Sequence, residues 1–178
     1  MELSVKSTSI TEPITRDEVK AYMGYPLTDT SQDDTIDIFI TTAREFLEGR
    51  TALSIVSKDY EAYFDIDDAD ESWYELPVIP VTKITSVTMN GVSTTYQQRG
   101  LKTVSICPDS VFGTILVGTT ISSYIDVLFT AGASNQTANN ILLELVSIAF
   151  NNRGGGDLSY ASLPYDLQKR INSISNNL

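Results

Sequence analysis

The spacing of apolar residues changes twice along this chain, from a helical period to a period of two and back, and this succession most limits the possible folds. Apolar residues recur every three or four positions over 36–47, alternate with polar ones over 56–64, and regain the helical spacing over 138–149. The first and last patterns indicate one-sided helices, and the middle one a half-buried strand. The sequence therefore predicts an α+β fold, with N-terminal and C-terminal helices packed together and a central antiparallel β block of hairpins.

Local signals mark the ends of the first two expected helices. Thr15 and Glu18 have the spacing of a capping box, and Gly24 is a natural stop for the helix that follows. The segment 31–34 has the same box chemistry, with an acidic residue three positions after a serine, so we expect it to open the second helix. Gly49 is the expected end of that helix.

Two more helices are expected near the C-terminal end of the sequence. Asn135 or Thr137 can cap the first of them, and the second is predicted to start at Pro164. One face of this last helix carries Leu163, Leu167, Ile171 and Ile174. We expect residues 1–178 to form a single domain, with helices over about 14–50 and 137–178 and the β block over about 55–131.

Within the β block, Asn90-Gly91 is the clearest turn signal, because both residue types tolerate the positive φ angles of a tight hairpin turn. The flanking runs 81–89 and 92–96 are rich in β-branched residues and predict a hairpin. Further strands are expected at residues 103–106, 113–117 and 124–130.

Charge and composition exclude several classes of protein. The chain has 178 residues, 23 acidic against 12 basic residues, a formal net charge of −11, no histidine and one cysteine, Cys107. An acidic surface is unsuited to holding nucleic acid, which needs clustered lysines and arginines. Catalysis that depends on histidine is excluded, and no catalytic motif is present. We therefore expect a non-enzymatic protein without a cofactor or a metal.

The N-terminal residues contain no apolar run typical of a signal peptide, and the charge-free stretch 110–125 is too short and polar to span a bilayer. A lone cysteine cannot form an internal disulfide. We therefore expect a soluble protein, made in the cytoplasm, without a membrane partner.

The densest charge feature is the run 59–75, which holds eight acidic residues and no basic one. Its centre is a candidate acidic surface made of Asp65, Asp67, Asp68, Asp70 and Glu71. A calcium-dependent binding module is the alternative function that this run suggests. An EF-hand loop from Asp65 fails at its fifth, sixth and twelfth positions, however, and a solvated loop tip is the simpler interpretation. Trp73, at the end of the run, suits either a partner contact or a cap on the sheet.

Four stretches, in order, resemble the head–tail connector (adaptor) proteins of long-tailed bacteriophages. Residues 14–22 (ITRDEVKAY) look like the family's opening helix, and 33–48 (DDTIDIFITTAREFLE) like its second helix. Residues 75–87 (ELPVIPVTKITSV) are similar to its leucine-proline strand, and 124–132 (YIDVLFTAG) to its late strand before a long helix that ends near Asn152-Arg153. The resemblance rests on the joint order of these structural patterns.

The resemblance implies a structural protein of the virion neck that forms a ring of twelve copies under the portal protein. The ring would bridge the portal to the tail or to a second neck ring, and genomic DNA would pass through it without specific binding. In such proteins the C-terminal segment engages the portal, which here points to Leu163, Leu167 and Ile171. A net charge of −11 per copy suits a channel that must let phosphates slide.

Overall fold

The structure is a computed structural model that describes residues 1–8, 11–66, 73–100, 105–108, 123–133, 135–152 and 158–176. The chain forms two compact units. A β unit contains residues 1–9 and 57–133, and a helical unit contains residues 10–56 and 134–178. Helices from both ends of the sequence pack on one another and the strands between them are antiparallel, so the α+β prediction is confirmed. That the whole chain is one domain stays a prediction.

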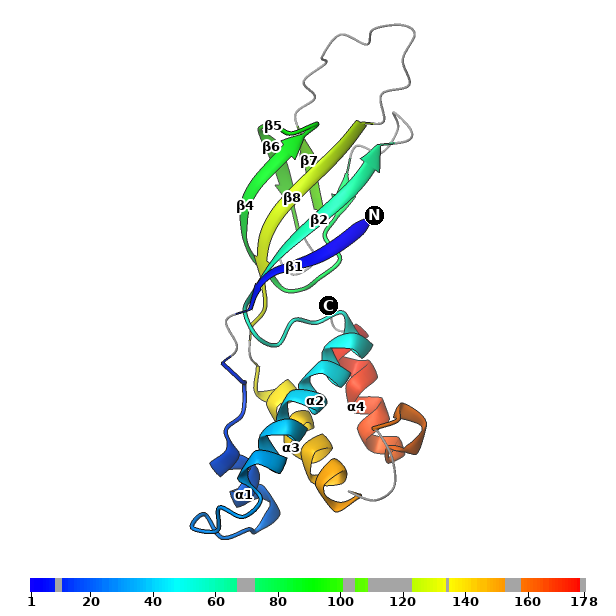
Figure 1. Cartoon of the computed structure of the whole chain (residues 1–178). Helices are drawn as coiled ribbons and strands as arrows, with labels where there is room; N and C mark the ends of the chain where they lie inside the picture. Colours follow the sequence, from blue (N-terminus) through cyan, green and yellow to red (C-terminus); the bar gives the residue numbers. More distant parts are fainter. Residues whose placement is uncertain are drawn as a thin grey trace, which may run out of the picture. The chain divides into compact units, whose positions relative to one another are not determined.

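The helical unit consists of α1 (Arg16–Met23), α2 (Asp33–Thr51), α3 (Gln136–Asn151) and α4 (Tyr165–Asn176), with a short 3-10 turn at Tyr160–Ser162 (Figure 1). Helix α3 contacts the other three helices, and α2 contacts α1 and α4. The core of this unit is a cluster of apolar side chains from all four helices, and its fully buried members include Val19, Ile36, Leu47, Leu145 and Leu167. The apolar residues that recur at helical spacing in the sequence are therefore the ones that each helix buries.

The ends of α1 follow the local signals. The Thr15 hydroxyl accepts a hydrogen bond from the Glu18 amide at 3.2 Å, and the Glu18 carboxylate accepts one from the Thr15 amide. Gly24 ends the helix in the left-handed region, at φ 69°. The capping-box prediction is confirmed.

The two ends of α2 were predicted wrongly. Its N-cap is Gln32, which makes no side-chain capping bond, and Asp33 in the first turn binds Arg16 and Lys20 of α1. The helix also continues through Gly49 to Thr51 and ends at Ala52, with φ 57°. A glycine inside a helix costs only about 1 kcal/mol, which the packing of a long helix outweighs.

The later helices start where their sequence predicts. The Asn135 side chain accepts a hydrogen bond from the Ala138 amide at 2.8 Å, so it is the N-cap of α3. Helix α4 begins directly after Pro164, whose carbonyl accepts the Gln168 amide. Both expectations are confirmed.

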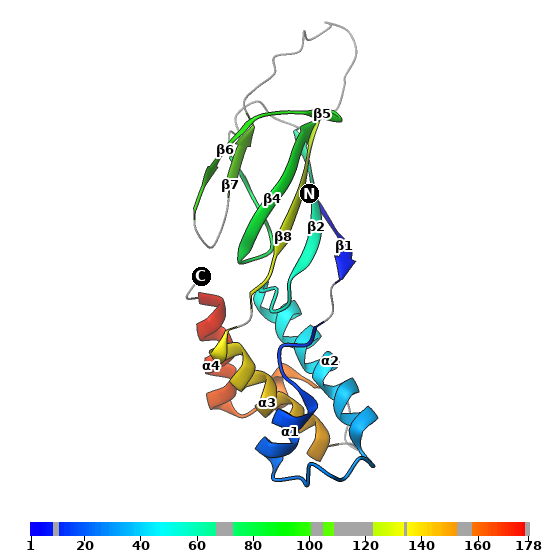
Figure 2. The ribbon, with the colours of Figure 1, turned by 90° about the vertical axis from the view of Figure 1, so that its left-hand side faces the viewer.

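The β unit has a five-stranded sheet and a three-stranded sheet (Figures 1 and 2). The first has the order β1-β2-β8-β4-β5 and the second β3-β7-β6. Their bounds are β1 Glu2–Thr8, β2 Lys58–Ile66, β3 Tyr74–Glu75, β4 Val81–Met89, β5 Val92–Ser93, β6 Tyr96–Arg99, β7 Ser105–Pro108 and β8 Ser123–Ala131.

The core of the β unit follows the period of two. Tyr60, Ala62 and Phe64 on β2 are buried, while the residues between them face the other way. Strand β8 alternates in the same manner, and the rings of Tyr60 and Phe129 stack with centroids 5.5 Å apart. Side chains of the second sheet, among them Ile106, complete this core.

The structure corrects the expected hairpin and adds a strand that was not expected. The turn at Asn90-Gly91 is confirmed by φ angles of 52° and 78°, but the returning strand is short: Val92 and Ser93 pair with β4, and the Thr94 amide donates a last hydrogen bond to the Val87 carbonyl. The expected hairpin strand to Tyr96 is therefore wrong, because Tyr96 starts β6 in the other sheet. Strand β1 was not anticipated, although Leu3 and Val5 alternate there with polar residues; its side chains, where described, are exposed. The expected strand at 113–117 lies outside the described residues.

Candidate functional site

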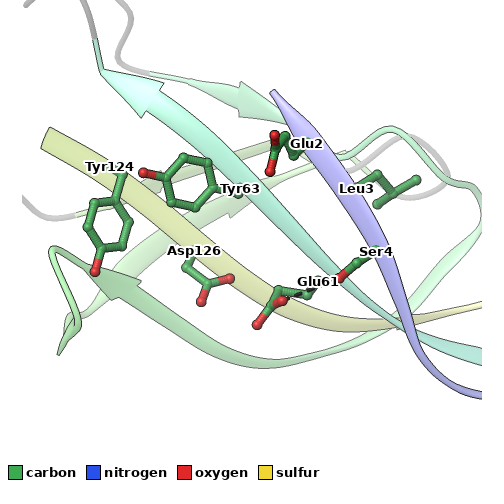
Figure 3. A pocket seen from close by; sticks show the side chains of 7 residues that line it. All are labelled: Glu2, Leu3, Ser4, Glu61, Tyr63, Tyr124 and Asp126. Carbon is green, nitrogen blue, oxygen red and sulfur yellow. Dashed lines mark hydrogen bonds between the residues drawn. The ribbon is translucent and has the colours of Figure 1, made fainter. Parts of the chain in front are cut away.

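The exposed face of the five-stranded sheet carries an open pocket of about 760 Å³ (Figure 3). Strands β1, β2 and β8 line it, with acidic and tyrosine side chains. The rings of Tyr63 and Tyr124 stack at a centroid distance of 4.9 Å on its floor. The side chains of β1, β2 and β8 that point away from the core therefore place polar and aromatic groups side by side on this face.

Glu61, on β2, forms the polar contacts that join β1 to this face. Its carboxylate lies 2.5 Å from the Lys6 ammonium and accepts a hydrogen bond from the Ser4 hydroxyl at 3.3 Å. The pairing with Lys6 lowers the pKa of Glu61 below its usual range. Since Ser4 and Lys6 are on β1, the ionised Glu61 carboxylate ties the edge strand to β2.

Asp126 lies beside Glu61 in the same pocket (Figure 3). Burial raises its pKa, and the nearby Glu61 carboxylate raises it further. Its Oδ1 atom is buried without a hydrogen-bond partner among the described residues. The two neighbouring carboxyl groups therefore differ, because Glu61 is held in its ionised form and Asp126 is shifted toward its protonated form.

A second charged cluster joins α1 to the start of α2. The Lys20 ammonium, whose side chain is 1% exposed, lies 2.5 Å from Asp33 and donates to the Asp29 carbonyl at 2.8 Å. Arg16 forms ion pairs with Asp33 and with Asp37. The Lys20 pair holds the pKa of Asp33 below its usual range. These contacts fix the linker between the two helices.

A third cluster surrounds Arg44 on α2. This buried guanidinium lies 2.9 Å from the carboxylates of Glu12 and Glu48. Glu48 also accepts the Ile55 amide at 2.8 Å. Arg44 therefore ties α2 to the segment before α1 and to the chain after its own end. Sequence analysis missed this role, although an arginine between Ala43 and Leu47 in an apolar stripe was a usable signal.

The three residues that the resemblance assigned to the portal lie inside the helical unit. Leu163 is 4% exposed, and Leu167 and Ile171 are fully buried. They pack in the core cluster with α2 and α3. The exposed side of α4 instead carries Tyr165 and Lys169.

Of the candidate acidic surface, only Asp65 is described, as an exposed residue at the end of β2. Asp67, Asp68, Asp70 and Glu71 lie outside the described residues. Trp73 is half-buried, and the Arg99 guanidinium lies 4.3 Å from its ring centroid. This cation–π contact joins β6 to the segment before β3 and favours the sheet-capping interpretation of Trp73.

Two further features are absent from the residues that the structure describes. None of their helices is long and apolar enough to cross a membrane. The same ranges contain no group of three or more acidic or cysteine side chains arranged to hold a metal ion.

Comparison with known proteins gives a likeness of fold. No protein-family model matches the chain, and no curated protein matches it. A chain from the neck of an empty gene transfer agent particle, computed with C6 symmetry, is similar over 98% of this chain and 95% of its own, with a TM-score of 0.73 and 17% identity. A chain from the virion of the native gene transfer agent particle is similar over 97% of this chain and 94% of its own, with a TM-score of 0.72 and 17% identity.

A chain from the neck of the native particle, computed with C12 symmetry, covers 98% of this chain and 94% of its own, with a TM-score of 0.69 and 16% identity. The likeness spans both units and nearly the whole length of each chain. The protein therefore has the fold of chains found in a particle neck.

Proposed function

We propose that the protein is a non-enzymatic structural component of a virion neck, a head–tail connector. The observation that carries the proposal is the similarity of fold to chains of a particle neck and virion, which covers 94–98% of the length of both chains in each comparison. Agreement over the full length matters because it includes the helical unit, the β unit and their order in the chain. The sequence resemblance to head–tail connectors points to the same place in a virion.

The connector would act as a ring of identical copies, twelve in number. The similar chains come from necks computed with C6 and with C12 symmetry, and twelve copies are compatible with both. A ring closes when each copy uses two different surfaces related by a fixed rotation. The ring supplies the mechanical function, so no reacting group is required.

The ring would lie under the portal protein and bridge it to the tail or to a second neck ring. Genomic DNA would pass through without specific binding. The net charge of −11 per copy supports this, because a ring of acidic copies repels phosphates and leaves the duplex free to move. Synthesis in the host cytoplasm before assembly fits the lone cysteine of the sequence.

Helix α4 is the proposed portal contact. Three buried residues would support that contact indirectly, because they hold α4 against α2 and α3: Leu163, Leu167 and Ile171. The residues that α4 exposes, such as Tyr165, would meet the partner. The three buried residues are therefore positioning residues in this proposal.

The mass of the chain in solution tests the proposal. Light scattering is measured on the chain alone and mixed with its candidate portal protein. We expect the mixture to contain a ring-sized species, near 235 kDa for twelve copies of a 19.6 kDa chain plus the portal. An unrelated ring protein of similar charge is the control. A chain that remains monomeric in the presence of the portal would refute the connector function.

A calcium titration separates this proposal from the alternative of a calcium-dependent binding module. An ion that binds only the folded chain must raise its melting temperature. We expect no rise at millimolar calcium. A rise that Asp65→Asn together with Asp67→Asn abolishes would favour the binding module.

A further inference from the structure

Among its described residues, the helical unit exposes four large apolar side chains, in two separate places. Tyr22, Leu27 and Ile38, which are 52%, 56% and 64% exposed, belong to α1, the following linker and the start of α2. Tyr165, 71% exposed, is the first residue of α4. A protein–protein contact typically has apolar groups at its centre and polar or charged groups at its rim.

The first place is acidic, and we call residues 16–38 the acidic end. It contains six acidic residues against two basic ones, Arg16 and Lys20. Both basic groups are already engaged with Asp33, and Arg16 with Asp37 as well. The exposed carboxylates of Asp17 and Asp34 therefore remain available to a partner and give this end a negative potential.

The second place carries more basic than acidic charge, and we call Arg50, Tyr165 and Lys169 the α4 flank; the exposed Asp166, next to Tyr165, is its one acidic neighbour on the first turn of α4. The Lys169 ammonium lies 4.8 Å from the centroid of the Tyr165 ring. The Arg50 guanidinium lies 4.3 Å from the ring of Tyr160, whose hydroxyl donates to the Gln168 carbonyl on α4. Among the described residues, neither cation has a carboxylate within ion-pair distance.

The acidic end and the α4 flank lie too far apart to satisfy each other within one copy. Ile38 and Arg50 are on the same helix, twelve residues apart, which corresponds to about 18 Å along α2. Both views show α1 and α4 on different sides of the helical unit (Figures 1 and 2). Opposite charges on separate surfaces of one molecule suit a head-to-tail contact between copies, which is the geometry that a closed ring requires.

We propose that the acidic end of one copy binds the α4 flank of the next copy around the ring. Asp17 and Asp34 face Lys169 and Arg50 of the neighbouring copy, and the exposed Leu27 and Ile38 pack against the neighbour's exposed tyrosine side chain. The inference rests on the proposed ring and names the two surfaces that build it. The occupant of each surface is a second copy of this chain.

Paired charge reversal tests the contact on the full-length chain. Variant A carries Asp17→Lys and Asp34→Lys, and variant B carries Arg50→Glu and Lys169→Glu. Association is measured by sedimentation velocity over a range of concentrations, without and with the candidate portal. We expect each variant alone to associate about tenfold or more weakly than the wild type, because like charges then face each other.

An equimolar mixture of A and B is the decisive sample. In an alternating ring, the reversed end of A meets the reversed flank of B, and the two native surfaces meet each other. We expect the mixture to recover association, which also shows that both variants are folded. Lys83→Glu and Glu75→Lys, exposed residues of the β unit, are the matched controls and should associate like the wild type.

The outcomes separate this contact from the neck function. Rings that form equally well with A or B alone, or a mixture that fails to recover, would overturn the contact while leaving the connector function intact. Association that A and B lose and their mixture regains, in a chain that ignores the portal, would support the contact and count against the neck function. A wild-type chain that is monomeric in both settings would refute both.

Discussion

The helical unit buries charged groups in pairs, whereas the β unit keeps its charges on an open sheet face. Lys20 and Arg44 are 1% and 4% exposed, and each is held by carboxylates at 2.5–2.9 Å. Glu61 and Asp126 lie in a pocket open to solvent. The same kinds of side chain therefore work in two different environments within one chain.

This difference predicts how each unit responds to the loss of a charge. A buried ion pair that loses one partner leaves an uncompensated charge in a poorly solvated place, which is strongly destabilising. An exposed pair is screened by water and contributes little. Substitution of a buried, paired charge of the helical unit should thus be costly, and substitution of a charge on the open sheet face of the β unit should be mild.

Arg44→Ala should have the largest effect. It leaves Glu12 and Glu48 without their common partner, and we expect a loss of about 3–5 kcal/mol in the free energy of unfolding, measured by urea denaturation. Arg50→Ala is the matched control on the same helix, and we expect it to cost about 1 kcal/mol or less. Equal costs at the two positions would contradict the contrast between buried and exposed charge.

Leu167→Ala should come next, since it removes a fully buried side chain from the helical core. We expect about 2–5 kcal/mol of destabilisation, seen as a lower denaturation midpoint, because a cavity remains. Tyr165→Ala, at an exposed position of α4, should change stability by about 0.5 kcal/mol or less. If the tyrosine variant proves the more damaging one, α4 is not held by the buried face that the structure shows.

Glycine substitutions sharpen the comparison at the level of the backbone. Gly91 has φ 78°, and a Cβ there meets only the Tyr124 hydroxyl at an ordinary 3.5 Å, so Gly91→Ala should cost about 1–2 kcal/mol through its backbone angle alone. Gly49 lies inside α2 with open space around it, so Gly49→Ala should stabilise by about 0.5–1 kcal/mol. Thermal melts of both variants show whether the signs are opposite.

Asp126→Asn should have the smallest effect, and it depends on pH. The raised pKa of Asp126 means that the folded chain binds this proton more tightly than the unfolded chain. Its contribution to stability is therefore lost as pH rises from about 3.9 through the raised pKa. The asparagine variant removes this fall, so its melting temperature relative to the wild type should rise slightly between acidic and neutral pH.

Glu61→Gln is the counterpart with the opposite sign. The lowered pKa of Glu61 gives stability that is present above its unfolded value and lost as pH falls through the folded value. The glutamine variant should therefore be less stable than the wild type at neutral pH and closer to it under acidic conditions. Matching pH profiles for the two variants would refute the assignment of different protonation to the two carboxyl groups.

Much of the helical unit could be predicted from local sequence, because a helix end is decided by neighbours in the chain. Thr15 and Glu18 cap α1, and Asn135 caps α3, as their spacing indicates. The start of α2 lies one residue after the position that the box at Ser31 indicates. The ion pairs of Asp33 with Arg16 and Lys20 could not be read from local sequence, because these residues approach only after folding.

Less of the candidate surfaces than of the helical unit could be predicted from the sequence. The period of two showed that Glu61 faces away from the core, but the order of strands decided that Asp126 and Lys6 lie beside it. Strand β1 gave only a short signal, the alternation of Leu3 and Val5 with polar residues, and both side chains are exposed, so this pattern does not mark a buried face. The portal residues named from resemblance proved to be core residues of the helical unit, since apolar spacing alone describes burial more directly than contact with a partner.

The sequence by itself determined the α+β class, the positions of most helices and strands, and the acidic character of the chain. These depend on spacing, capping and composition, which are properties of residues close together in the chain. Only the tertiary structure decided which charges are buried, which strands are neighbours and where the acidic end and the α4 flank lie. Those features depend on pairing between distant segments, and many pairings are compatible with one pattern of apolar residues.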